Sequence, residues 1–246
     1  MKKFRINEIF YSLQGEGHNT GRAAIFIRFA GCNLRCPFCD TEFDSYREMT
    51  ADDIIASIAP YPARFVVLTG GEPTLQADEA FVDLLHQHGY EVAMESNGIR
   101  PAPHNLDWLT VSPKSLPLTP SDWRGDSKAM GGSIARGNSI ARGDSIVKGD
   151  SIVKGDAQDG LANDRVRMGK APDEIKVVFE NETSLHQLIA TFPLQSEGVR
   201  ARLFLQPCDT GDAERNKLIL RDCIDYIQQH PEWRLSLQTH KLIDIK

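Results

Sequence analysis

Three of the five cysteines in this chain, Cys32, Cys36 and Cys39, fall within eight residues. They follow directly on an apolar stretch, residues 23–29, which has the composition of a buried strand. Thiolates at such spacing converge on one metal centre, because short loops bring their sulfurs together at little entropic cost. A structural zinc ion or an ordinary four-iron cluster takes four protein ligands. Three thiolates on a four-iron cluster would leave one iron open, and an open metal position is where chemistry happens.

The alternative to a cluster is a zinc knuckle, in which His18 or Asp40 completes the ligand set. The two hypotheses predict different kinds of fold. A zinc knuckle serves a binding module, whereas an open iron position at the end of a strand is suited to an α/β barrel, whose ligands bind at the carboxyl ends of the strands.

The totals limit the compartment and the partners. Five cysteines, an odd number with three of them clustered, argue against a secreted disulfide framework. The net charge of −6 gives no sign of a nucleic-acid-binding surface. No apolar run is long enough to span a membrane, and the N-terminus leads into a strand rather than into the core of a signal peptide. We therefore expect a cytoplasmic protein with neither nucleic acid nor membrane as a partner.

Strand-like and helix-like stretches alternate along the chain, which predicts an α/β fold with a parallel sheet. About seven strands and four helices are expected. The helices are expected at 51–59, 77–88, 184–191 and 212–230. Polar and glycine-rich residues recur where the strands end, which predicts a series of binding loops along one rim. The chain is too short for eight full units, so the sequence predicts an open, truncated (β/α) barrel formed by one domain, 1–246.

A low-complexity insertion interrupts this domain at 116–172. Six-residue units begin at Gly125, Gly131, Gly137, Gly143 and Gly149, and a degenerate sixth begins at Gly155. Hexads can form a left-handed β-helix, but five units make fewer than two coils of about eighteen residues, too few to bury a core. We expect a mobile surface insertion instead, without a catalytic role.

Two further features lie near the cysteines. The loop 12–17 has two glycines around Glu16, which lets the backbone approach a ligand closely, although a plain glycine turn is the alternative. Arg28 is the only charge in the apolar stretch 23–29. A buried arginine is costly unless it is paired. It therefore either pairs with Glu16 or receives the carboxylate of a substrate, which suits its fork of donors.

The cysteine pattern C-x3-C-x2-C resembles that of the radical S-adenosylmethionine (SAM) superfamily. A second motif of that superfamily, Gly70-Gly71-Glu72-Pro73, follows the next strand. The resemblance implies that Cys32, Cys36 and Cys39 hold a 4Fe-4S cluster and that SAM chelates the open iron. An electron from the reduced cluster then cleaves SAM to methionine and a 5'-deoxyadenosyl radical. It also implies that Phe38 packs against the adenine of SAM.

Longer pieces are similar to the 7-carboxy-7-deazaguanine synthase family, over the whole chain outside the insertion. They are residues 10–17, 26–28, 39–41, 68–73, 112–114, 173–176, 205–207 and 237–241. The resemblance implies the conversion of 6-carboxy-5,6,7,8-tetrahydropterin to 7-carboxy-7-deazaguanine, a ring contraction with loss of ammonia, in queuosine and deazapurine biosynthesis. It also implies a truncated barrel of the radical SAM type, Mg²⁺, a homodimer, and an electron donor such as flavodoxin or ferredoxin.

The same resemblance implies site residues, with no catalytic side chain beyond the cofactor radical. Those implied for SAM are Phe38, Asp40, Gly71, Glu72, Ser112, Pro113, Lys114, Gln206, Pro207, Cys208 and Asp209. Those implied for the pterin are Leu13, Gln14, Gly15, Glu16, Arg28, Thr69, His240 and the terminal carboxylate of Lys246. Thr41 is implied to give its hydroxyl to Mg²⁺.

Two competing functions remain open from the sequence. A glycyl-radical-enzyme activase shares the cluster motif, but it acts on a protein backbone and lacks the loop at 13–17. A zinc-dependent binding module would use the hexad repeats as a docking surface. Cys223 and the histidines other than His240 are expected to be packing or surface residues.

Overall fold

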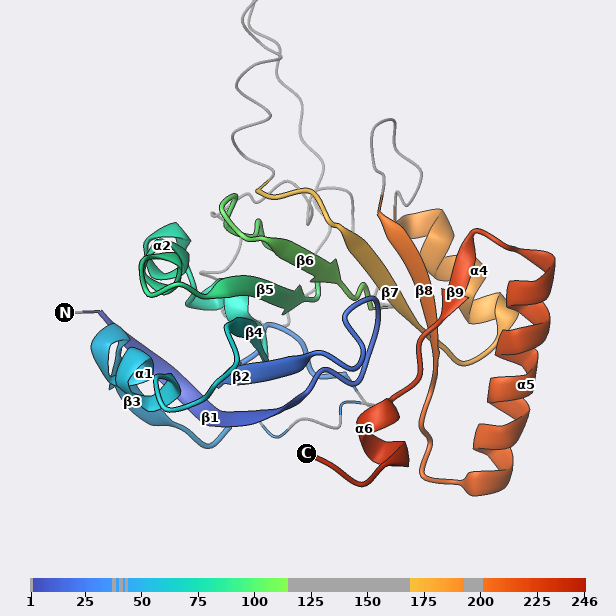
Figure 1. Ribbon diagram of the computed structural model, residues 1–246. Helices are drawn as coiled ribbons and strands as arrows, with labels where there is room; N and C mark the ends of the chain where they lie inside the picture. The colour runs from blue at the N-terminus through green and yellow to red at the C-terminus, as the bar shows by residue number, and fades with distance from the viewer. Residues whose placement is uncertain (1, 37–38, 40–41, 43, 115–168, 193–200) are drawn as a thin grey trace, which may run out of the picture.

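The structure, a computed structural model, describes residues 2–36, 39, 42, 44–114, 169–192 and 201–246 (Figure 1). The predicted insertion at 116–172 lies outside the described residues, except for 169–172. Phe38, Asp40 and Thr41 also lie outside them. In the part of the chain that is described, no helix is both long and apolar enough to cross a membrane.

In the described part of the chain, nine strands form one sheet in the order β3-β1-β2-β4-β5-β6-β7-β8-β9 (Figure 1). Their bounds are β1 Lys3–Leu13, β2 Ala23–Phe29, β3 Arg47–Thr50, β4 Phe65–Gly70, β5 Glu91–Ser96, β6 Trp108–Val111, β7 Glu174–Phe179, β8 Arg202–Pro207 and β9 Trp233–Leu235. Every neighbouring pair from β2 to β9 is parallel. Their carboxyl ends therefore share one rim. The sheet has two edges, β3 and β9, which confirms the prediction of an open, truncated barrel.

The first edge of the sheet departs from the expected parallel arrangement. Strand β1 pairs antiparallel with both β2 and β3. A short hairpin joins β1 to β2, and a connection of that length can only reverse the chain. Strand β3 was not expected, and the count of about seven strands was too low. Met49 is its one buried side chain, so the strand gives almost no hydrophobic signal.

The four expected helices are confirmed. They are α1 Ala51–Ile58, α2 Glu79–Gln87, α4 Glu182–Thr191 and α5 Ala213–Gln229. Thr50 caps α1 through a capping box with Asp53, which accepts from the Thr50 N–H at 2.9 Å. Two short elements were not expected, the 3-10 turn η1 Pro73–Leu75 and α6 Thr239–Leu242. Helix α2 also begins later than predicted, because η1 occupies the preceding residues and Asp78 provides the cap.

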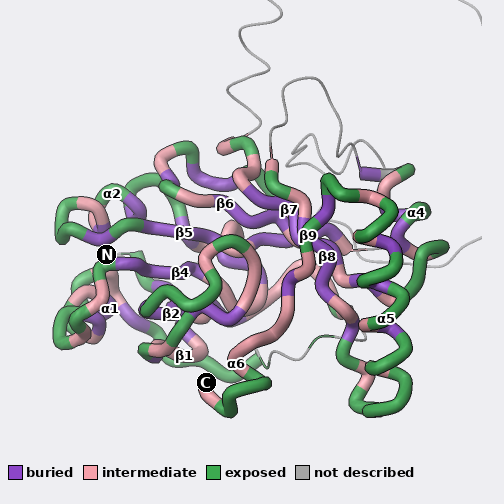
Figure 2. Tube along the Cα trace, turned by 45° about the vertical axis from the view of Figure 1, so that its right-hand side comes forward, coloured by how far each residue is buried: buried purple, intermediate pink, exposed green. Residues whose placement is uncertain are grey.

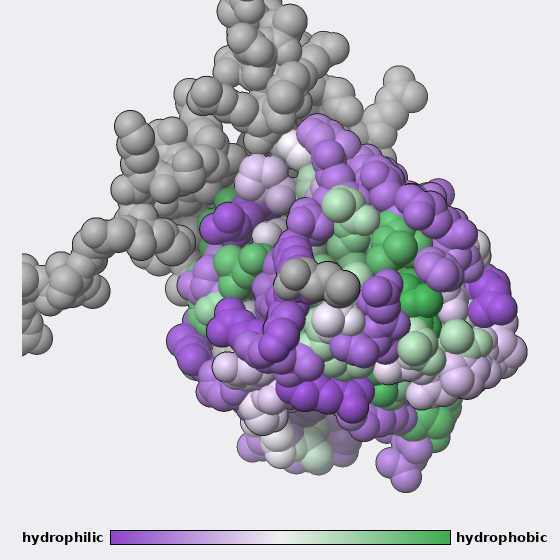
Figure 3. All heavy atoms as spheres, turned by 90° about the vertical axis from the view of Figure 1, so that its left-hand side faces the viewer, coloured by the Kyte–Doolittle hydropathy of each residue, from purple (hydrophilic) through white to green (hydrophobic). Residues whose placement is uncertain are grey.

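The helices cover one face of the sheet, and their outer sides are exposed (Figure 2). That face carries the larger apolar core, which includes Ile25, Ile27, Leu68 and Met94 with the inner sides of α1, α2, α4 and α5. At the end of the molecule formed by α1 and α2, hydrophilic side chains predominate, with smaller groups of hydrophobic ones among them (Figure 3). The amphipathic helices thus shield the sheet and present a polar surface.

The inner face of the sheet is built in two layers, because alternate residues of a strand point to the same side. Phe26, Val67, Ala93 and Trp108 lie in register across four parallel strands and form an apolar layer. Two residues further along each strand the side chains are polar, and they lie at or near the carboxyl ends. These residues are Arg28, Thr69, Glu95 and Thr110. The polar layer therefore faces inward at the rim, directly above an apolar floor.

Candidate active site

A cavity of about 370 Å³ lies at the carboxyl ends of the parallel strands, where a barrel binds its ligands. The expected site residues that line it are Glu16, Cys32, Cys36, Cys39, Thr69, Gly71, Ser112, Lys114, Gln206, Pro207, Cys208 and Asp209. Lining residues that were not named from the sequence include Glu95, Ser96, Asn97, Lys176 and Gln238. The cavity thus brings all three cysteines together with residues from seven segments of the chain.

The cysteine loop is held by the loop that follows β4. The Gly71 N–H donates to Phe29 O at 2.9 Å, and the Glu72 N–H donates to Gly31 O at 2.9 Å. A Cβ on residue 71 would lie 2.0 Å from Gly31 O. Only glycine permits this approach of two backbones. Gly71 therefore holds the start of the cysteine loop in position against the loop after β4.

Glu72 lies next to the cavity rather than among the residues that line it. Its side chain is fully buried, and its carboxylate accepts from Thr74 N–H at 3.0 Å, Thr74 Oγ1 at 2.6 Å, Ser96 Oγ at 2.9 Å and Asn97 N–H at 2.8 Å. Asn97 Nδ2 in turn donates to Asn33 Oδ1 at 2.8 Å. The carboxylate therefore ties the loops after β4 and β5 together, and Asn97 extends that tie to the cysteine loop.

We expect Glu72→Gln to lower the free energy of unfolding by about 3 kcal/mol, because an amide nitrogen would face donors that now bond to a buried carboxylate. Urea unfolding of the protein without iron measures this directly. Glu48→Gln is the matched control: Glu48 forms an exposed ion pair with Lys3, and its loss should cost less than about 1 kcal/mol. Equal effects of the two substitutions would contradict the role assigned to Glu72.

The three thiols of the cysteine loop lie at one cavity, where they can hold a metal centre. All three line the cavity, and Leu34 N–H donates to Cys32 Sγ at 3.4 Å, a contact of the kind that tunes iron–sulfur centres. Burial raises the pKa of the Cys32 and Cys36 thiols, so a metal must displace their protons.

The hairpin between β1 and β2 crosses the open side of the barrel and reaches the last strands (Figure 1). Gly17 N–H donates to Ser236 Oγ at 3.0 Å, and Thr239 N–H donates to Gly15 O at 3.0 Å. A Cβ on residue 15 would lie 2.2 Å from His240 Nδ1, so this glycine has a steric reason. The loop at 12–17 is therefore more than a plain turn, because it joins the two ends of the sheet over the cavity.

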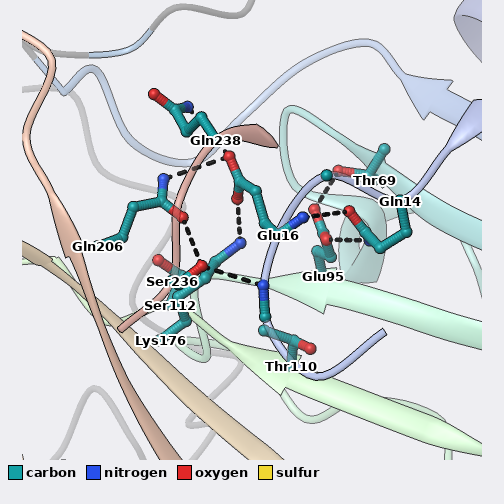
Figure 4. A network of polar contacts seen from close by, with 12 residues as sticks. Gln14, Glu16, Thr69, Glu95, Thr110, Ser112, Lys176, Gln206, Ser236 and Gln238 are labelled. Atoms are coloured by element: carbon teal, nitrogen blue, oxygen red, sulfur yellow. Dashed lines mark hydrogen bonds and ion pairs between the residues drawn. The ribbon is translucent and has the colours of Figure 1, made fainter. Parts of the chain in front are cut away.

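Glu16 is the centre of a polar network on the cavity wall (Figure 4). Its carboxylate forms an ion pair with Lys176 of β7, and it accepts from Gln238 Nε2 at 3.0 Å and Gln206 Nε2 at 3.2 Å. Burial opposes the charge on Glu16, but the Lys176 ammonium and the hydrogen bonds outweigh it and hold the pKa of Glu16 at about 2. Burial likewise opposes the charge on Lys176, and the facing carboxylates raise the pKa of Lys176 nevertheless.

A second carboxylate, that of Glu95, lies beside this network (Figure 4). It accepts from Gln14 Nε2 at 2.9 Å and from Thr69 Oγ1 at 3.1 Å. Gln14 Oε1 accepts from the Glu16 N–H at 3.1 Å, so the two acidic residues are linked through Gln14. Glu95 was not among the expected site residues, although it begins one of the strand-end loops that the sequence predicts as binding loops of the rim.

Lys114 projects into the same cavity. Its ammonium donates to Ser112 Oγ at 2.7 Å. Burial and the nearby Lys176 ammonium lower the pKa of Lys114. Three lysines, Lys114, Lys176 and Lys241, therefore line the cavity together with several carboxylates, an arrangement suited to a polar, charged ligand.

Of the two alternatives for Arg28, the structure does not have the pairing with Glu16, because Glu16 pairs with Lys176. Arg28 is half-buried, its Nε lies 3.8 Å from Glu8, and its guanidinium lies over the Phe10 ring at 5.3 Å. The C-terminal residue is close by: Lys246 pairs with Glu8, and its backbone oxygen accepts from the Ser12 hydroxyl. Arg28 and Lys246 thus share a neighbour, Glu8, at the β1 side of the site.

The expected residues that do not line the cavity itself are Leu13, Gln14, Gly15, Arg28, Glu72, Pro113, His240 and Lys246. Gln14 and Gly15 border it through the hydrogen bonds above. Leu13 is exposed at the end of β1. Phe38, Asp40 and Thr41 lie outside the described residues.

Three comparisons relate the chain to known proteins. Residues 26–117 match the model of the Radical SAM superfamily. The chain is 40% identical to a 7-carboxy-7-deazaguanine synthase of Bacteroides thetaiotaomicron over 98% of both chains, and 35% identical to one of Bradyrhizobium diazoefficiens over 99% of both. A crystal structure of QueE from Escherichia coli is similar with a TM-score of 0.62 and 28% identity, over 96% of this chain and 93% of that one.

Proposed function

The chain belongs to the 7-carboxy-7-deazaguanine synthase family of radical SAM enzymes, and from this premise we propose that it forms 7-carboxy-7-deazaguanine from 6-carboxy-5,6,7,8-tetrahydropterin. Membership implies a 4Fe-4S cluster and SAM as cofactors. The reaction contracts the ring and releases ammonia, as a step of queuosine biosynthesis. The residues present suit both the cofactors and a pterin.

One observation carries this proposal. A single cavity is lined by three cysteines and, on a neighbouring wall, by the Glu16 network with its carboxylates and amides. A ligand held by that wall lies next to whatever the cysteines hold. Proximity of this kind between cofactor and substrate accounts for a large part of enzymatic rate enhancement.

The residues of the chain bind and orient. When bound, the cluster and SAM supply the radical that starts the reaction. Ser112, Lys114 and the segment 206–209 line the cavity and offer polar groups to SAM. Glu16 and Thr69 line the cavity, Gln14 borders it, and all three offer hydrogen-bonding groups to the edge of a pterin.

Further features of the family are proposed here on resemblance alone. Mg²⁺ would take the Thr41 hydroxyl together with oxygens of the substrate and water, which is the ligand set it prefers. A homodimer is proposed, as is a flavodoxin or ferredoxin as the electron donor. The single domain 1–246 with an insertion that lies away from the site also remains a proposal.

Anaerobic turnover tests the function. The protein, reconstituted with iron and sulfide, is incubated with the carboxytetrahydropterin, SAM and a reductant, and the products are identified by mass. Appearance of 7-carboxy-7-deazaguanine together with methionine is the expected result. Cleavage of SAM with no change of the pterin, under conditions in which the pterin binds, would overturn the substrate assignment.

Arg28→Lys is expected to weaken binding of the carboxylated pterin by about tenfold, because lysine keeps the charge and loses the paired donors that suit a carboxylate. Slow SAM cleavage without pterin should persist, since the cysteine loop is unchanged. Calorimetric titration measures the Kd.

The matched control is Arg22→Lys, which also removes a paired contact, here with Glu91 at 2.7 and 3.0 Å, but at the surface. Its Kd should equal that of the wild type. An unchanged Kd in Arg28→Lys, or loss of SAM cleavage together with thermal stability, would favour a purely structural role for Arg28.

A further inference from the structure

Lys176 has no role in the assignments above, yet it occupies the centre of the cavity wall. It projects from the middle of β7, a strand whose other side chains are mostly apolar, and its side chain is 8% exposed. A buried ammonium is costly unless carboxylates surround it. Its partner Glu16 comes from the hairpin of the first two strands, 160 residues away in the chain. The Glu16–Lys176 pair therefore forms only after the hairpin and β7 have come together in the folded protein.

The charges that face the pair come from every element packed around it. Glu95 and Glu174 add negative charge near Lys176, whereas Lys114 and His240 add positive charge near Glu16. The charged and titratable groups around the pair are Glu95 of β5, Lys114 after β6, Glu174 of β7 and His240 of α6. Lys176 is thus the cation that allows several carboxylates to coexist in one buried place.

The hydrogen bonds to Glu16 and Glu95 show how many further donors these two carboxylates can accept. A carboxylate has about four lone-pair sites. Within the described part of the chain, Glu16 receives hydrogen bonds from Lys176, Gln206 and Gln238, and Glu95 receives them from two groups. The remaining acceptor sites belong to side chains that these hydrogen bonds hold in place on the cavity wall. Such a wall recognises a neutral ring that presents N–H donors, and an aminopyrimidinone edge has that character.

We infer that Lys176 is a positioning residue, which keeps Glu16 ionised and oriented so that the cavity accepts the N–H donors of an aminopyrimidinone ring. The ligand part of this inference rests on the proposed function. The action of Lys176 on Glu16 does not, and it can be tested without any ligand.

The first test follows the stability of the substrate-free protein against pH. In the wild type, the lowered pKa of Glu16 adds stability above its ordinary value of 4.5 that is lost as the pH falls toward 2. Lys176→Met removes the largest influence that lowers the pKa of Glu16 and leaves the hydrogen bond from Gln238 and the charge of His240 to oppose burial, so we expect that pKa to rise. The folded protein then binds the proton more tightly than the unfolded chain. Its unfolding equilibrium constant should rise by up to about tenfold per pH unit as the pH increases from 4.5.

Two further variants make this test decisive. Adding Glu16→Gln to Lys176→Met removes the buried charge and should abolish the new pH dependence. Lys170→Met is the matched control, since it removes a half-buried ion pair with Asp173 at 3.2 Å outside the cavity. It should keep the wild-type pH dependence. If Lys176→Met does not fold but the double variant does, the inference is supported; if neither folds, it is overturned.

The second test measures the Kd of the carboxytetrahydropterin for the anaerobic, cluster-loaded enzyme from pH 8 to pH 6. Any titration of the ligand itself is common to all variants. In Lys176→Met, binding should weaken by up to about tenfold per pH unit relative to the wild type, because protonated Glu16 loses its acceptor sites. Lys170→Met should follow the wild type.

The outcomes separate the two proposals. A wild-type enzyme that binds no pterin at any pH would refute the proposed function, while the stability test would still decide the role of Lys176. A Lys176→Met variant with the wild-type pH dependence of stability would overturn the inference, whatever the pterin does.

Discussion

Cys36→Ala is expected to abolish both iron loading and SAM cleavage. Two thiolates cannot replace three on a four-iron cluster, and the cavity offers no further cysteine of the same loop. The wild type, reconstituted without oxygen, should contain about four irons and four sulfides per chain. The variant should contain almost none. Iron and sulfide analysis, visible absorption and methionine release measure the effect.

Cys223→Ala is the matched control, because it removes a cysteine from the buried face of α5, where burial raises the pKa of the thiol to about 12. It should keep the cluster and lose some stability through the smaller side chain. A Cys36→Ala variant that retains brown colour and full activity would contradict the cluster assignment. One zinc per wild-type chain, with no sulfide, would do the same.

Gly71→Ala should have the second largest effect, through backbone contact alone. The added Cβ would lie 2.0 Å from Gly31 O and 2.6 Å from Gly31 C. Neither loop can yield without losing the two hydrogen bonds that join them, so the start of the cysteine loop must move. We expect iron loading and SAM affinity to fall by about tenfold or more, which corresponds to about 1.4 kcal/mol or more.

Gly89→Ala controls for the loss of a glycine. Its φ of 78° makes alanine unfavourable there by about 1–2 kcal/mol, but no atom lies within 4 Å of the added Cβ. Its iron content should match that of the wild type, although its thermal stability falls. If Gly71→Ala loads iron as well as Gly89→Ala does, the two loops are not rigidly coupled.

The cysteine loop and the loops of the rim could be predicted because their signals are local. Each follows an apolar strand directly, and parallel strands bring their ends to one edge. The short edge strand β3 could not, because its one buried side chain, Met49, carries no pattern. The antiparallel pairing of β1 with β2 was also not predicted. The expectation of a parallel sheet came from the alternation of strands and helices, and no helix separates these two strands.

The Glu16–Lys176 pair shows where sequence reasoning stops. A lone charge in an apolar strand indicates that a partner exists, and this signal is present at both Arg28 and Lys176. Such a signal does not identify the partner, because Glu16 and Lys176 are 160 residues apart in the chain and come together only when the hairpin packs against β7. Gln238 lies in the stretch 237–241 that resembles the family, but nothing in that stretch indicates its hydrogen bond to Glu16. Glu72 was recognised through its motif, but its bonds to Ser96 and Asn97 depend on a neighbouring strand.

The closure of the cavity by the first hairpin and the last residues sets the order in which a newly made chain can mature. Glu16 and Gln238, which bond across the site, are separated by 222 residues. The chain emerges from the ribosome with its N-terminus first, so early strands can pair while later ones are still being synthesised. The cysteines emerge early in this process, but their cavity is completed only when the segment after β9 is free to dock. Iron that reached the thiols before that moment would meet an open, water-filled loop. We therefore expect the cluster to be inserted after synthesis, once the segment after β9 has docked on the hairpin.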